Sequence, residues 1–227
     1  MTHDQQTSLW YLRSCSMFDL CSESELEQIG GMARVHSAIR DSQISLDQVG
    51  SHVYFIKSGF MKIVRVLPDG NEVVADLLGP GEFFGRIEDV SGADIAPFTE
   101  EYAVAIDEVM VCLFDRPTFE RALMEFPSLN KSLLAHVADR VEYISTRLVD
   151  MAFRSANERF DGFLSRMAQR YGIRNGDSTR IPIRLTHSEL GMLTGLSRQT
   201  VVRLVGDYRR MGRLEMTSTE IILNHNS

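Results

Sequence analysis

The spacing of apolar residues changes once, near Asp115, in this chain of 227 residues. Between about residues 35 and 114 they fall in short runs bounded by Gly, Asp or Pro, such as 52–57, 61–66 and 72–78, which is typical of β-strands. After Asp115 they recur every three to four residues, which is typical of amphipathic helices. The order of these two patterns predicts an α+β fold with a strand-rich first part and a helical second part.

Turn chemistry refines the strand-rich part. Pro68-Asp69-Gly70-Asn71 separates two of the runs, and because Pro presets φ while Asp and Gly favour turn geometry, the two runs are predicted to form an antiparallel hairpin. Several short strands at this spacing predict a small antiparallel barrel or jelly roll. A short helical prelude from Leu9 to about Ala33 precedes it.

Two helical segments follow, at 117–126 and at about 128–151. The longer one carries apolar residues at alternating intervals of three and four, the repeat of a coiled-coil seam. These seam residues are Leu134, Val137, Val141, Ile144, Leu148 and Met151. The pattern favours a parallel pair of helices and hence a homodimer, and the alternative is a single helix packed on its own domain by the same stripe.

Charge is divided unevenly along the chain. The formal net charge is -7, but residues 1–153 hold 12 Lys+Arg against 24 Asp+Glu, whereas residues 154–227 hold 12 Arg and no Lys against 7 acids. An Arg-rich third is a candidate for contact with phosphate, the alternative being a chance asymmetry of the surface.

Composition excludes several other classes. With 44% hydrophobic and 24% charged residues the chain has the composition of a globular protein, and no apolar run approaches the roughly 18 to 20 residues of a membrane span. The polar start MTHDQQTSLW lacks the order of a secretory signal, which predicts a cytoplasmic location. Three cysteines are too few for a disulfide framework and are interpreted as reduced thiols.

The stretch 185–205, LTHSELGMLTGLSRQTVVRLV, comes after a predicted helix at about 156–170 and a polar loop at 171–178. Thr186 suits an N-cap before a helix over 188–194, Gly195 marks a break, and a second helix begins near Ser197. Two short helices joined by a Gly-containing turn predict a helix-turn-helix, the alternative being an ordinary helical hairpin with solvated arginines.

A second helix of this kind enters the major groove of DNA. Arg198, Gln199 and Arg203 would then meet base edges, since Arg can bond guanine O6 and N7 and Gln can bond adenine N6 and N7. Ser197 and Thr200 suit phosphate oxygens, which position the protein without reading sequence. Thr186, His187 and Arg213 complete the set of candidate DNA contacts.

Five segments together resemble the cyclic-AMP receptor protein and fumarate-nitrate reduction regulator (CRP/FNR) family of bacterial transcription factors over nearly the whole length. They are Val53-Tyr-Phe-Ile-Lys-Ser-Gly59, Leu67-Pro-Asp-Gly70, Leu78-Gly-Pro-Gly-Glu-Phe-Phe-Gly85, the long helix ending Met151-Ala-Phe153, and Ser197-Arg-Gln-Thr-Val-Val-Arg203.

The resemblance implies three parts. Residues 1–115 would form the prelude and a cyclic-nucleotide-binding-like barrel, 116–153 the short helix and the dimerisation helix, and 154–227 a winged helix-turn-helix with its wing hairpin near Gly212 to Leu223. In the cyclic-AMP receptor branch the recognition helix commonly reads Ser-Arg-Glu-Thr. Here Gln199 replaces the Glu, which predicts a half-site related to but different from the usual TGTGA type.

The sensor sequence departs from cyclic-AMP binders of this family. Arg86 stands where the resemblance expects the Glu that holds the ribose, and residues 87–101 contain five acids and no Arg or Lys, so a cyclic phosphate would meet repulsion. We therefore expect ordinary cyclic-AMP binding to be absent, unless Arg86 itself takes the phosphate. One alternative is that Arg86 binds another anionic effector. The other is that Arg86 has only a structural role, in an ion pair with Glu88 or Asp89. The candidate effector pocket comprises Phe84, Gly85, Arg86, Ile87, Glu88, Ser145 and Thr146.

Other signals stay open as weaker alternatives. Haem would need His36, His52 or His136, which are scattered, and an iron-sulfur cluster would need four cysteines where the chain has Cys15, Cys21 and Cys112. A thiol switch between Cys15 and Cys21 is compatible with the sequence but not required by it. No metal-ligand set is assigned.

The sequence thus predicts an allosteric, homodimeric DNA-binding regulator with a hinge near Met151 to Ser155 and no catalytic residues. Its implied partners are a palindromic operator in double-stranded DNA, RNA polymerase and an unidentified small-molecule effector, with no membrane. An effector-independent regulator is a variant of this prediction. The rival class, a small-molecule-binding or enzymatic module, lacks a Ser-His-Asp order, a metal-spaced set or a P-loop.

Overall fold

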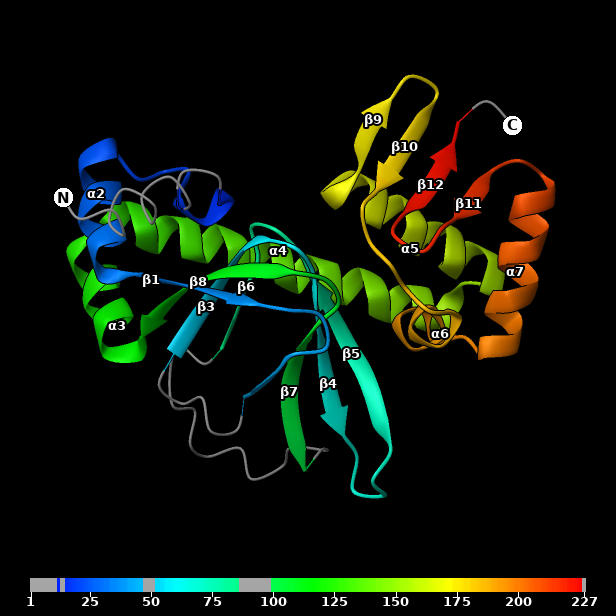
Figure 1. Ribbon diagram of the computed structural model, residues 1–227, viewed down its shortest axis with the longest axis horizontal. Helices are drawn as coiled ribbons and strands as arrows, with labels where there is room; N and C mark the ends of the chain where they lie inside the picture. Colours follow the sequence, from blue (N-terminus) through cyan, green and yellow to red (C-terminus); the bar gives the residue numbers. More distant parts are fainter. Residues whose placement is uncertain (1–11, 13–14, 47–51, 86–98, 226–227) are drawn as a thin grey trace. The chain divides into compact units, whose positions relative to one another are not determined.

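The structure, a computed structural model, describes residues 12, 15–46, 52–85 and 99–225 (Figure 1). The chain forms two units, Met1–Arg140 and Val141–Ser227, whose boundary falls inside the long helix α4. The described elements of the first unit are η1 (Ser16–Phe18), α2 (Glu23–Met32), β1 (Arg34–Ala38), β2 (Gln43–Ser45), β3 (His52–Ser58), β4 (Met61–Val66), β5 (Glu72–Leu78), β6 (Phe83–Gly85), β7 (Glu100–Ala105), β8 (Val109–Asp115), α3 (Arg116–Glu125) and the start of α4 (Pro127–Phe153).

The strands of the first unit form two antiparallel sheets of four strands each, in the orders β1-β8-β3-β6 and β2-β7-β4-β5. The predicted α+β class and jelly-roll arrangement are confirmed, but within the described residues the sheets form an open sandwich and not a closed barrel, because no ladder joins one sheet to the other. The predicted hairpin is β4–β5, whose turn is fixed by Asp69 Oδ1 accepting a hydrogen bond from the Asn71 amide at 3.0 Å.

Alternating side chains place the first sheet between two cores. On β3, Phe55 packs on one face with Phe114 of β8 and Phe119 of α3, while Ile56 packs on the other face between the two sheets. Leu129, near the start of α4, is buried in the helix-side core. Because successive side chains of a strand point to opposite faces of the sheet, β3 contributes to both hydrophobic layers.

The seam of α4 faces outward. All six of its apolar residues are 43–66% exposed: Leu134, Val137, Val141, Ile144, Leu148 and Met151. The alternative of a helix packed on its own domain by this stripe is thus without support. A continuous exposed apolar stripe of this kind is typical of an association surface.

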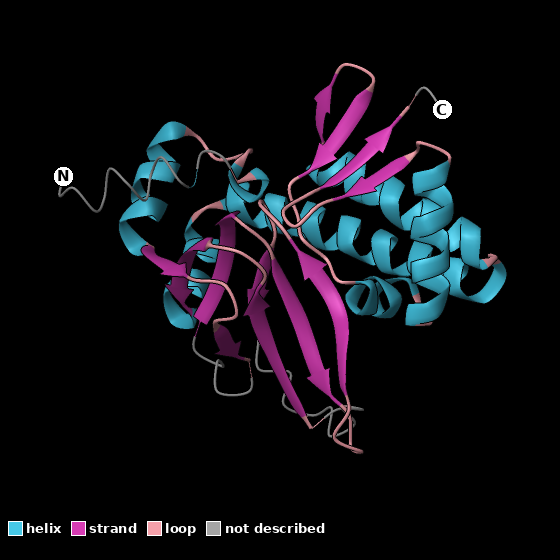
Figure 2. Ribbon diagram, turned by 45° about the vertical axis from the view of Figure 1, so that its right-hand side comes forward, coloured by secondary structure: helices cyan, strands magenta, loops and turns pink. Residues whose placement is uncertain are grey.

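The second unit contains the rest of α4 and a helical domain with a small sheet (Figure 2). Its further elements are α5 (Ala156–Tyr171), β9 (Ile173–Asn175), β10 (Ser178–Ile181), α6 (His187–Thr194), α7 (Arg198–Arg210), β11 (Leu214–Met216) and β12 (Ile221–Asn224). Phe160 of α5 meets the Tyr208 ring of α7 edge-on, with 5.5 Å between centroids. The predicted helices and wing hairpin are confirmed.

The predicted polar loop at 171–178 is wrong. It contains the hairpin β9–β10, in which Ser178 pairs with Asn175 across a two-residue turn, and β10 pairs with β12 so that the wing belongs to a four-stranded sheet in the order β11-β12-β10-β9. Gly176, at φ 57°, supplies the left-handed conformation that such a turn favours. The strands are too short for periodicity to reveal them. In the described part of the chain, no helix combines the length and apolarity needed to cross a membrane.

Candidate nucleic-acid interface

Local hydrogen bonds define both helices of the helix-turn-helix. Thr186 is the N-cap of α6 and forms a capping box with Glu189, whose carboxylate accepts from the Thr186 amide at 2.8 Å. Gly195 ends α6 at φ 66°, and Ser197 caps α7 by accepting from the Thr200 amide at 3.1 Å. The predicted N-cap at Thr186, the break at Gly195 and the start of the second helix near Ser197 are confirmed, since each depends on residues within four positions of one another.

The turn between the helices is tight. The Leu196 amide donates to the Gly191 carbonyl at 2.8 Å, and a Cβ at position 191 would lie 2.7 Å from the Leu196 carbonyl oxygen. Only glycine permits this approach. The first residues of α7 are thereby held at a fixed place against α6.

One face of α7 is buried and the opposite face is exposed. Val201, Leu204, Val205 and Tyr208 face the core. The exposed face brings together all three predicted base-reading residues, Arg198, Gln199 and Arg203, and adds Val202, Gly206, Arg209 and Arg210. The 3.6-residue period that buries one face therefore presents the other as a polar, cationic strip.

Val202 and Asp207 were not among the predicted residues of the interface. Val202 is exposed beside Arg203, where a methyl group can meet a thymine methyl. Asp207 accepts from Arg203 Nη1 at 3.2 Å and also pairs with Arg210. The spacing of four between Arg203 and Asp207 is a sequence signal that would have found this pair.

The predicted phosphate-contacting hydroxyls are already engaged in the helix caps. Ser197 and Thr200 are 2.8 Å apart at their hydroxyl oxygens, and the Thr186 hydroxyl donates to Glu189 Oε2 at 2.9 Å. His187 is half-buried at the first position of α6. At the N-termini of α6 and α7, backbone amides are accordingly the more available donors for an anion.

Arg213 is engaged within its own unit. Its guanidinium lies 4.7 Å from the centroid of the Tyr208 ring and 3.5 Å from Asp161 Oδ1, on the wall of a cavity of about 300 Å³. Burial, with Asp161 beside it, raises the pKa of Tyr208 to about 12. The predicted DNA contact of Arg213 would therefore use donors other than Nη2, or require the side chain to leave these partners.

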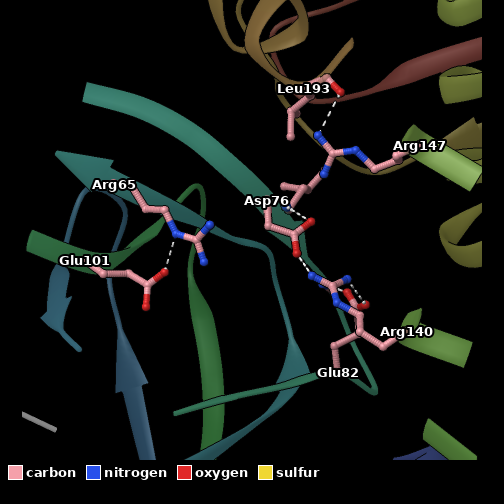
Figure 3. Close-up of polar contacts among 9 residues, drawn as sticks. Arg65, Asp76, Glu82, Glu101, Arg140, Arg147 and Leu193 are labelled. Carbon is pink, nitrogen blue, oxygen red and sulfur yellow. Dashed lines mark hydrogen bonds and ion pairs between the residues drawn. The ribbon is translucent and has the colours of Figure 1, made fainter. Parts of the chain in front are cut away.

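Polar contacts fix the end of α4 within the second unit. The buried carboxylate of Asp150 accepts from Arg166 of α5 at 2.7 Å and pairs with Arg154 at 2.9 Å across the break between α4 and α5. Arg147 Nη2 donates to the Leu193 carbonyl of α6 at 3.2 Å (Figure 3). The break lies at the predicted hinge, but these long-range partners are not apparent in the sequence.

The predicted effector pocket is only partly described. Phe84 is buried on β6 and stacks on Tyr54 with 4.8 Å between centroids. Gly85 has φ 109°, and a Cβ there would lie 2.5 Å from the His52 carbonyl oxygen, which explains the glycine. Arg86, Ile87 and Glu88 lie outside the described residues. Ser145 and Thr146 belong to the part of α4 that lies in the second unit.

The first unit instead contains an ion-paired cluster that the sequence does not reveal (Figure 3). Arg140 of α4 pairs with the Asp76 carboxylate of β5, and its Nη1 lies 3.7 Å from Glu82 Oε1. Asp76 and Glu82 are both buried. A phosphate placed beside this cluster would meet two carboxylates around an already neutralised cation.

The described histidines and cysteines do not form a metal-binding group. His36, His52 and His136 lie on β1, β3 and α4, and the described residues contain no group of three or more His, Cys, Asp or Glu placed to hold a metal. All three cysteines are free thiols. Burial raises the pKa of Cys15 to about 11 and that of Cys112 to about 12, which keeps both thiols protonated near neutral pH.

A sensor-type sandwich joined through a long helix to a capped winged helix-turn-helix defines a DNA-binding transcription regulator with an effector-binding type of N-terminal domain. Residues 44–126 match the cyclic nucleotide-binding domain, and residues 158–226 match the Crp-like helix-turn-helix domain. The chain belongs to the CRP/FNR family.

Two relatives and one solved structure illustrate the similarity. The chain is 30% identical to the CRP-like cAMP-activated global transcriptional regulator of Mycobacterium tuberculosis over 77% of this chain and 76% of that protein. It is also 30% identical to the global nitrogen regulator of a Synechocystis species, over 76% of each. The structure of FixK2 from Bradyrhizobium japonicum shares the fold with a TM-score of 0.69 and 22% identity, covering 86% of this chain and 93% of that one.

Proposed function

We propose that this protein is a homodimeric regulator that reads a palindromic operator through α7, under the control of a signal received by its N-terminal unit. The observation that carries the proposal is the exposed face of α7, on which Arg198, Gln199 and Arg203 stand together. Guanidinium and amide groups in this position suit guanine and adenine edges in the major groove. No catalytic role is assigned to any residue.

The exposed seam of α4 supports the homodimer. A parallel pair of α4 helices would bury the stripe and set two recognition helices for major-groove sites about 34 to 36 Å apart. Ile144→Glu should shift the protein to monomer in sedimentation, because it places a charge in the seam. Met124→Glu is the control, since Met124 is also apolar and is 83% exposed against 47% for Ile144, but it lies on α3. A dimer that survives Ile144→Glu unchanged would contradict the α4 interface.

The sensor is proposed to take a signal other than ordinary cyclic AMP, with Phe84, Gly85, Arg86, Ile87 and Glu88 as its candidate contacts. The carboxylates around Arg140 support this, because they disfavour a cyclic phosphate nearby. Effector-driven movement about the break at Arg154 and Ser155, and contact with RNA polymerase, complete the proposed mechanism. The second candidate is a regulator that always binds DNA and is controlled by its own abundance. It is favoured by the same unfavourable setting for a cyclic phosphate.

Selection from a random pool of DNA duplexes tests the function, with purified protein and no added ligand. Enrichment of a two-fold symmetric site supports operator reading and an active unliganded state. If nothing is enriched, the selection is repeated with cyclic AMP and then with cell extract; enrichment only then identifies effector dependence. No enrichment in any arm, or duplex affinity insensitive to salt, would contradict the DNA-reading proposal and favour the small-molecule-binding rival.

The identity of the half-site is tested separately. Gln199→Glu should gain affinity for a TGTGA-type palindrome relative to the parent, because Glu accepts from cytosine N4. Absence of any gain would contradict the prediction that Gln199 makes the half-site differ from the TGTGA type.

A further inference from the structure

Asp207 lies on the recognition helix between two arginines of the exposed face. It accepts from Arg203 Nη1 at 3.2 Å through one carboxylate oxygen and pairs with Arg210 through the other. The Asp207 side chain is 25% exposed, against 57% for Arg203 and 80% for Arg210. The carboxylate is therefore the inner, more sheltered member, and the two guanidinium groups project beyond it.

The two predicted guanine-reading arginines are held differently. Within the described residues, the Arg198 side chain makes no hydrogen bond or ion pair, whereas Arg203 is tethered at Nη1. Tethering at Nη1 leaves the edge formed by Nε and Nη2 of Arg203 available. That edge has the two parallel donors that guanine O6 and N7 require.

We propose that Asp207 is a positioning residue that fixes the guanidinium plane of Arg203 and thereby sharpens base selection by that arginine. The inference rests on the proposed operator reading and adds to it. An arginine held before binding loses less rotamer freedom on contact, and a fixed plane tolerates the wrong base less well. Asp207 also places a negative charge near the DNA backbone, so it improves selectivity while weakening binding to every sequence.

These two effects can be separated by experiment. Affinities of the full-length protein are measured for the selected palindrome and for duplexes changed at one base pair in each half-site. Asp207→Asn should lower discrimination about fivefold to tenfold at the base pair that Arg203→Ala also relaxes, and at no other, while binding to unrelated duplex becomes tighter. In the Arg203→Ala background, Asp207→Asn should change no base preference, since the group it positions is gone.

Glu215→Gln is the matched control, because it removes the same charge from an exposed position on the wing strand β11. It should change affinity for all duplexes alike and leave every preference in place. Loss of fold does not explain the expected result for Asp207→Asn, because an acid in the last turn of α7 opposes the helix dipole and its removal is not destabilising on that account.

Uniform tightening by Asp207→Asn, with all base preferences retained, would overturn the positioning role and leave the operator proposal intact. A change in preference that persists without Arg203 would overturn it as well. If the parent protein selects no site in any arm, the operator proposal and this inference fail together.

Discussion

In the unit Met1–Arg140, the side chain of Arg140 is 25% exposed and pairs with two buried carboxylates, whereas in the unit Val141–Ser227 the side chain of Arg203 is 57% exposed and pairs with one carboxylate on its own helix. The same kind of ion pair thus has a different role in each unit. A pair removed from water holds elements of the fold together, while an exposed pair contributes little to stability and leaves the remaining donors of its arginine accessible to DNA.

The comparison also explains why the net charge of a segment does not by itself predict where a polyanion binds. Residues 154–227 are basic and residues 1–153 are acidic, but what a polyanion meets depends on which charges reach the surface. Asp161 and Tyr208 engage one of the arginines of the basic third, Arg213, while the exposed face of α7 presents others.

The largest effect is expected from opening a cavity in one unit only. Phe55→Ala removes a ring that packs against Phe114 and Phe119, and should destabilise the N-terminal unit by about 3–5 kcal/mol. Phe160→Ala is the counterpart in the second unit. If calorimetry shows that each variant lowers both transitions equally, the two units are not energetically separate.

The two arginines themselves provide the next test. Arg140→Met leaves Asp76 and Glu82 buried without their cation and should cost about 3 kcal/mol in urea unfolding. Arg203→Met should change stability by no more than about 0.5 kcal/mol, because its pair is exposed, yet should lose specific DNA binding. Equal stability losses in the two variants would remove the distinction between a buried and an exposed pair.

Thiol chemistry sharpens the contrast between the inside and the surface of the N-terminal unit. Because burial raises the pKa of Cys15 to about 11, at pH 8 it holds roughly a hundredfold less thiolate than a thiol of pKa 9. Burial also raises the pKa of Cys21, but Cys21 is only half-buried and should be alkylated first. Mass spectrometry of the native protein identifies the modified residue. Rapid modification of Cys15 at that pH would revive the thiol switch.

The raised pKa values of the buried thiols also predict how the stability of the N-terminal unit depends on pH. The unfolded chain ionises its thiols near pH 9, whereas Cys15 and Cys112 remain protonated in the fold until about pH 11 and 12. The folded state therefore binds more protons in that interval, and the stability of the N-terminal unit should fall as the pH rises above 9. Denaturant midpoints at pH 8 and pH 10 measure it. A Cys15→Ala variant should lose part of this dependence.

A smaller loss of stability than that of the core and buried-pair variants is expected at the start of the recognition helix. Ser197→Ala removes the acceptor for the Thr200 amide and should lower stability by about 1 kcal/mol. Ser188→Ala, an exposed substitution inside α6, is the control. Thermal unfolding measures both. Identical melting temperatures would mean that packing of α7, and not its cap, sets where the helix begins.

The sequence by itself determined the change from strands to helices near Asp115, the N-cap of α6, the β4–β5 hairpin and the exposed face of α7. Each depends on side chains within a few residues of one another, through helical or strand periodicity or through bonds from a side chain to nearby backbone. The Arg203–Asp207 pair belongs to this class too, although only the structure drew attention to it.

Only the tertiary structure decided that the N-terminal sheets, over the residues described, form an open sandwich, that β9 and β10 join the wing, that Arg140 pairs with Asp76 and Glu82, and that Arg213 packs on Tyr208. These groups are far apart along the chain. Their contacts are set by how the whole unit packs to bury apolar surface and satisfy buried charge, which no local repeat encodes.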